Sequence, residues 1–110
     1  MKNYVQKGQN LTLTAPRALS SGAGFLVGSI FAVASADAAL GAPVVGVTEE
    51  VFDLPKAAGA VTPGAKAYWD NTAFVVTTSA TGTVLIGAFI QAAASADATA
   101  RVKLTGQIAA

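Results

Sequence analysis

The feature that most constrains this chain is a two-residue alternation, interrupted about every eight to twelve residues by glycine or proline. Residues 10–14 (NLTLT) place Leu11 and Leu13 on one side and threonines on the other. Residues 101–105 (RVKLT) repeat the pattern, and we expect Val102 and Leu104 to face inward. Such alternation is typical of strands with one buried face. No segment sustains a helical period for three turns, so we predict an all-β fold: a small sandwich or barrel of short strands, with at most one or two short helical turns.

Two further segments have the composition of strands. Residues 67–78 (AYWDNTAFVVTT) predict a hairpin with its turn at Asp70 and Asn71. Residues 44–54 (VVGVTEEVFDL) predict one strand or a pair of strands, in which Gly46 could mark a bulge.

The pentapeptide Ala-Ser-Ala-Asp-Ala occurs twice, at residues 34–38 and 94–98. The upstream stretches 25–31 (FLVGSIF) and 84–90 (VLIGAFI) also align, glycine over glycine. A corner of small residues whose aspartate bonds its own backbone is suitable for a turn. The repeat therefore predicts a turn joining two equivalent β units, and the alternative is chance similarity in an alanine-rich chain.

The number and distribution of charged residues indicate which partners this chain could bind. Charged residues make up 12% of the chain, about half of the roughly 25% usual for a soluble domain. A surface with so few charged residues indicates that copies of the chain or a larger assembly cover part of it. The net charge of +1, with scattered cations, gives no reason to expect nucleic acid.

The absence of cysteine excludes disulfides and fits assembly in a reducing cytoplasm. The first ten residues contain no apolar signal segment.

Two charge-free intervals, 18–36 and 71–96, are long enough to cross a bilayer. Glycine, serine and threonine interrupt both of them, whereas spanning helices need about 20 predominantly apolar residues. We therefore expect no association with a membrane.

The chain contains few of the side chains that enzymes use for catalysis. The chain contains no histidine and no cysteine, which removes most general bases, nucleophiles and transition-metal ligands. Residues 41–48 have the glycine spacing of a phosphate loop, but Val47 stands where lysine is required. Residues 22–28 have dinucleotide-loop spacing without the expected flanking strand and helix. Glu49 and Glu50 are adjacent and point to opposite faces of a strand. We predict no enzyme activity, no cofactor, and no catalytic, cofactor-binding or metal-binding residues.

Three long segments resemble the phage capsid cement, or head decoration, proteins: residues 3–34, 51–78 and 82–107. The most specific part is Leu-Pro-Lys-Ala at 54–57 followed by Tyr-Trp-Asp-Asn at 68–71. The resemblance implies a small β-rich subunit, often trimeric, on the outside of an expanded phage head or prophage-encoded capsid, and it brings no catalytic residues. Similar sequences have been labelled RecA/RadA-type phage recombinases, which the missing phosphate-loop lysine argues against.

We therefore expect one domain over residues 1–110, in a structural virion protein that is made in the bacterial host cytoplasm. It would bind the major capsid protein and stabilise the mature head. Residues 1–16 are a candidate docking arm that adds a strand to a partner's sheet edge, and the alternative makes 10–14 an ordinary first strand. The residues expected to dock on the capsid are Tyr4, Val5, Leu11 and Leu13. Those expected in a homotrimer interface are Trp69, Phe89 and Ile90, with Trp69 equally suited to the core. Alternative functions are a tail or fibre β-module and, further off, a small-ligand-binding barrel.

Overall fold

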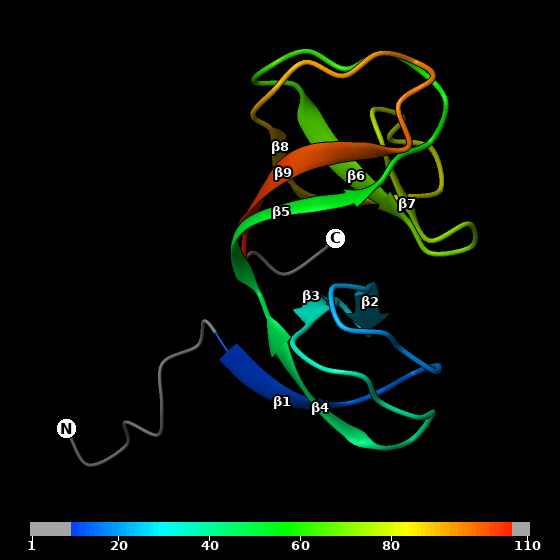
Figure 1. Cartoon of the computed structure of the whole chain (residues 1–110), viewed down its shortest axis with the longest axis vertical. Coiled ribbons are helices and arrows are strands. Elements are labelled where there is room, and N and C mark those ends of the chain that lie inside the picture. The colour runs from blue at the N-terminus through cyan, green and yellow to red at the C-terminus, as the bar shows by residue number, and fades with distance from the viewer. Residues whose placement is uncertain (1–9, 107–110) are drawn as a thin grey trace, which may run out of the picture.

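The computed structural model describes residues 10–106, which form nine strands and no helix. The strands are β1 (Asn10–Thr14), β2 (Gly24–Val27), β3 (Ile30–Ala34), β4 (Pro43–Val47), β5 (Glu49–Pro55), β6 (Lys66–Asp70), β7 (Val75–Thr77), β8 (Val84–Phe89) and β9 (Thr99–Thr105). They form an antiparallel sheet of order β1-β4-β3-β2 and a second of order β5-β9-β8-β6-β7 (Figure 1). The prediction of an all-β fold with at most one or two short helical turns is confirmed for this part of the chain.

The second sheet curls until its first and last strands approach each other. Lys56, directly after β5, forms a parallel bridge with Val76 of β7. The N–H of Ala57 donates to the carbonyl of Val76 at 2.9 Å. The wall of this half-barrel is therefore continuous at one end of β5.

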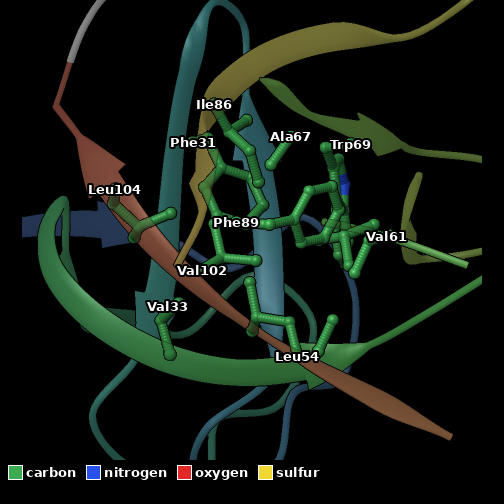
Figure 2. Close-up of a cluster of buried hydrophobic side chains, with 12 residues drawn as sticks. Phe31, Val33, Leu54, Val61, Ala67, Trp69, Ile86, Phe89, Val102 and Leu104 are labelled. Atoms are coloured by element: carbon green, nitrogen blue, oxygen red, sulfur yellow. The ribbon is translucent and has the colours of Figure 1, made fainter. Parts of the chain in front are cut away.

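The largest buried cluster lies between the two sheets (Figure 2). Phe31 and Val33 of β3 enter it beside the side chains of the second sheet, and the rings of Phe31 and Trp69 are 4.9 Å apart between centroids. The intervening residues of β3 belong to a smaller cluster on the other face of the first sheet. Both faces of β3 are thus buried, which explains its continuous apolar sequence. The smaller cluster comprises Ala15, Leu19, Phe25, Ala32, Ala34 and Val44.

The two sheets repeat one four-stranded arrangement. The first unit, β1–β4, has the order β1-β4-β3-β2, and the second unit, β5–β9, has the same order in β5-β9-β8-β6. The hydrogen bonds at the ends of the first strands also match. Ala15 donates to the carbonyl of Ala42 at 2.9 Å, and Lys56 donates to the carbonyl of Ala98 at 3.0 Å.

The segments that lead into β2 and β6 match in the same way. Gly22 donates to the carbonyl of Ala34 at 2.8 Å, and Gly64 donates to that of Phe89 at 2.7 Å. Both glycines have a φ of +87°, a conformation that glycine adopts without steric cost. Corresponding isolated bridges are Leu19 with Ala38 and Val61 with Ala93. The prediction of two equivalent β units is confirmed.

The register proposed from the sequence repeat is wrong. Gly28, with a φ of +59°, forms part of the two-residue turn between β2 and β3. Gly87, aligned with it in sequence, lies inside β8 opposite Ala67 and Leu104. Local similarity in an alanine-rich chain concealed the true correspondence, which the hydrogen bonds reveal.

The two aspartates of the repeat also differ. Asp97 accepts a bond from the N–H of Ala94 at 2.8 Å, as a turn aspartate should. Asp37 accepts from the N–H of Ser21 at 2.8 Å and so joins two loops rather than bonding its own neighbours.

Two local expectations need correction. Gly46 is not a bulge, because it pairs in register with Leu11. A Cβ at Gly46 would lie only 2.6 Å from the Cβ of Ala32, so the glycine permits close packing. The hairpin between β6 and β7 forms, but Asp70 is still paired with Val75 and the turn occupies the residues between them.

Candidate functional site

A polar hollow of about 190 Å³ lies on the second unit, lined by Asp53, Gln91, Ala92, Ala93, Asp97, Thr99, Ala100 and Arg101. Asp53 and Arg101 face each other across β5 and β9. The guanidinium donates to both carboxylate oxygens, at 3.0 and 3.2 Å. The hydrogen bond from Arg101 lowers the pKa of Asp53, and the same bond raises the pKa of Arg101.

The two carboxylates of this hollow are engaged in hydrogen bonds. Asp53 is held as a carboxylate, and one oxygen of Asp97 is engaged by the backbone of Ala94. Within residues 10–106 no cluster of acidic residues could hold a metal ion. The pair at Asp53 and Arg101 is half exposed, and surface pairs of this kind contribute little to stability.

Lys56 is buried, and its ammonium is fully engaged in structure. It donates to the carbonyls of Ala57 at 2.9 Å, Gly59 at 2.8 Å and Ser95 at 3.3 Å. These bonds tie the segment after β5 to the loop before β9. Because all three donors point at backbone oxygens, Lys56 stabilises the fold rather than binding a ligand.

Arg17 connects the two units. Its Nη2 donates to the carbonyl of Gly24 at 2.6 Å, and the guanidinium carbon lies 3.8 Å from the ring centroid of Phe74, in the turn between β6 and β7. Burial lowers the pKa of the Arg17 guanidinium. The cation therefore serves as an internal tie.

The residues expected to dock on a capsid fall in two places. Tyr4 and Val5 lie outside the described residues. Leu11 and Leu13 lie on β1 and are half-buried, and Leu13 packs against the smaller cluster. Residues 10–14 form a strand that pairs with β4 in the first sheet, and a docking role for residues 1–16 stays a prediction. The outward side of β1 belongs instead to Thr12 and Thr14, the other half of the same alternation.

The residues expected in a self-association interface also divide. Trp69 and Phe89 are 1% and 0% exposed and belong to the large cluster, whereas Ile90 is 44% exposed. Of the three, Ile90 alone presents its side chain to a partner in this fold. Its role in self-association stays a prediction.

The strand edges differ in how they are protected. β5 carries Glu49, Glu50 and Asp53, and Glu50 interrupts its regular backbone with a φ of +89°. β7 is only three residues long and is bridged to the end of β5. On the edge of β2, Arg17 occupies one carbonyl. β1 has no charge and no proline, the usual devices against unwanted pairing.

The first unit is also nearly free of charge. Between residues 10 and 48 the charged residues are Arg17 and Asp37, and both make the internal bonds described above. Two apolar side chains protrude from this uncharged part: Leu40 is 70% exposed and Val45 is 41% exposed. Depletion of charge around apolar residues is characteristic of the centre of a protein interface.

A family of phage cement proteins matches residues 5–104. The chain belongs to this family. No curated protein and no solved structure gives a significant match to it. The family places this cement protein among the structural proteins of phages that associate with the capsid, and it confirms the resemblance seen in the sequence.

In this cement protein, the described surface includes the edge of β1, which has no charge and no proline, and the exposed apolar side chains of Leu40 and Val45. None of the described residues forms a helix long and apolar enough to span a membrane. Sequence reasoning placed Thr12 and Thr14 on the face opposite the leucines but did not name them as candidate contacts, and it missed Leu40 and Val45 as surface residues. The alternation contained the signal for the threonines, but Leu40 and Val45 become visible only once the sheet is built.

Proposed function

We propose that this cement protein binds the outer surface of a phage or prophage-encoded capsid and stabilises the mature head. The observation that carries the proposal is the edge of β1, which contains no charge and no proline, beside an almost uncharged unit in a chain of the cement family. A cement subunit stabilises a shell by bridging neighbouring shell proteins. It needs an extended, chemically inert contact surface for this role, and no catalytic activity.

We place the docking arm in the segment that precedes β1. With residues 10–14 in the body, the docking arm is residues 1–9, with Tyr4 and Val5 as its apolar contacts. Strand addition to a sheet edge of the major capsid protein gives main-chain hydrogen bonds without requiring charge complementarity. The body acts as one domain, is made in the host cytoplasm and forms a homotrimer on the capsid exterior.

The test mixes the purified protein with expanded and unexpanded heads of its own phage and measures co-sedimentation. We expect binding to expanded heads only, because maturation creates the site. Binding to tails rather than heads would favour a tail or fibre component and contradict the cement proposal.

Deletion of residues 1–9 tests the arm. We expect the shortened protein to keep its β-sheet circular dichroism and to bind expanded heads at least tenfold more weakly, since the arm's contacts are lost. The control replaces Lys2 and Lys7 with serine at full length and should bind normally. Undiminished binding of the shortened protein would refute the arm.

A further inference from the structure

The two β units differ in one strand, β7, which has no counterpart among the described strands of the first unit. In the second unit, β7 lies along the outer edge of β6, with Val76 opposite Trp69. Val76 is fully buried and reaches the end of β5 through its bridge with Lys56. β7 therefore closes the space between the fourth and first strands of the unit.

In the first unit, the corresponding strands are β2 and the end of β1, and no described strand lies between them. Gly24 pairs with Val33 as Lys66 pairs with Ala88, which fixes the correspondence of β2 with β6. Counted along β2 and β6 from this pair, Val27 occupies the place of Trp69, although β8 has a register shift opposite Ala67 and Tyr68 that β3 does not have. Val27 is only half-buried, as expected for a core residue whose covering strand is missing.

The free edge of β2 has backbone groups suited to a partner strand. Ala34 donates to the carbonyl of Ala23, so the alternation of an antiparallel ladder turns the N–H and C=O groups of Gly24 and Leu26 outward. The Gly24 carbonyl is taken by Arg17. No described strand pairs with Leu26 on that side, so the open stretch is about as long as β7.

The end of β1, on the opposite side of the opening, has fewer backbone donors for a partner strand. In the second unit, the N–H of Ala57 donates to β7. The matching bonds of Lys56 and Ala15 place Pro16 at the corresponding position, and proline has no N–H to donate. A strand in the first unit would be held mainly by β2, which favours a reversible partner over a permanent part of the wall.

We propose that this opening accepts a short extended segment of the shell protein in the place that β7 takes in the second unit. The segment pairs antiparallel with β2 and presents a small or β-branched apolar side chain over Val27. Arg17 lies at this edge, but its guanidinium is already bonded to the Gly24 carbonyl and stacked on Phe74, so the segment needs no charge in its centre. This inference rests on the proposed function, which supplies the shell protein as partner.

The chain's own first residues are poorly placed to fill the opening. A strand there would run parallel to β1, as β7 runs parallel to the end of β5. Parallel neighbours require a connection of about a dozen residues or more, and residues 1–9 are too few to supply both that connection and a strand. A strand from another molecule has no such limit.

The experiment supplies the missing strand within the chain. Residues 28–29, the turn between β2 and β3, are replaced by a copy of residues 70–83, the segment that contains β7 in the second unit. The matched control carries the same insertion with Val75→Gly, Val76→Pro and Thr77→Gly in the inserted copy, so its length is equal but it cannot pair. Melting temperature, oligomeric state and co-sedimentation with expanded heads are measured for both and for the parent protein.

We expect the strand graft to melt at a higher temperature than the control and to bind heads at least tenfold more weakly, because its opening is filled. The control should bind like the parent. Equal melting temperatures, or equal binding by strand graft and control, would overturn the proposal. A graft that dissociates oligomers of the parent but still binds heads would identify a second copy as the occupant and overturn the shell assignment.

Failure of the cement function is distinguishable, since a parent that binds no heads refutes that function while the melting temperatures still report on the opening. If the strand graft does not fold, a peptide of residues 71–79 is added to the parent instead. We expect the peptide to raise the melting temperature and compete with heads, whereas a scrambled peptide should do neither. Identical behaviour of the two peptides would also overturn the proposal.

Discussion

Gly87 lies where β8 passes closest to β9. A Cβ at this position would collide with the backbone carbonyl oxygen of Lys103, which cannot move without disturbing the ladder. Gly82 presents the opposite situation: its φ is +70°, but a Cβ at this position would have no neighbouring atom within 4 Å. The two glycines are therefore required for different reasons, steric at one and conformational at the other.

We expect Gly87→Ala to destabilise the protein by about 3 kcal/mol, the upper end for overpacking, because the obstacle is backbone. Gly82→Ala should cost only about 1 kcal/mol, the penalty for a left-handed backbone. Urea unfolding followed by circular dichroism measures both. A smaller loss for Gly87→Ala than for Gly82→Ala would contradict the close approach of β8 and β9.

At the scale of elements, the segment between β1 and β2 is tied to the turn between β6 and β7. Arg17 bonds the carbonyl of Gly24 and stacks on Phe74. Phe74 itself has a φ of +58°, uncommon for a bulky residue, and is 37% exposed. The contact with Arg17 is thus a reason for an otherwise unfavourable backbone to persist.

A double-mutant cycle with Arg17→Ala and Phe74→Ala should give a coupling of about 0.5–1 kcal/mol in the free energy of unfolding. Arg17→Lys should recover only part of the stability, because an ammonium lacks the planar group that stacks on the ring. Strictly additive losses in the cycle would show that the ring and the guanidinium do not interact.

At the scale of the whole molecule, the two units share one core. Phe31 and Val33 from the first unit pack into the cluster that contains Trp69 from the second. Neither unit buries its apolar face alone, so they should unfold together. The chain has one tryptophan, and its place at this junction makes it a direct reporter of the contact.

Phe31→Ala should destabilise the whole protein by about 3–5 kcal/mol, the usual cost of removing a buried phenylalanine ring. Tryptophan fluorescence and far-ultraviolet circular dichroism should still change at the same urea concentration. Val45→Ala, at an exposed position, is the control and should change stability by less than about 0.5 kcal/mol. Two separate transitions in the parent protein would contradict the shared core.

Much of the fold could be predicted from local patterns. The alternation in residues 10–14 and 101–105 located β1 and β9 and the faces of Val102 and Leu104, since a two-residue period leaves one face for the core. The repeat predicted two equivalent units, but the alignment of its two copies was wrong because small residues match easily by chance. The role of Gly46 was also wrong, because close packing against another strand leaves no local mark in the sequence.

The sequence by itself determined strands, turns, the absence of His and Cys chemistry, and a surface poor in charge, because each follows from residue type and short spacing. Only the tertiary structure decided which edges are protected and that Trp69 and Phe89 are core while Ile90 is exposed. It also decided that no strand within residues 10–106 closes the first unit as β7 closes the second. Those properties depend on pairing between residues distant in the chain. Pairing of that kind is set by the packing of whole sheets, which no short stretch of sequence contains.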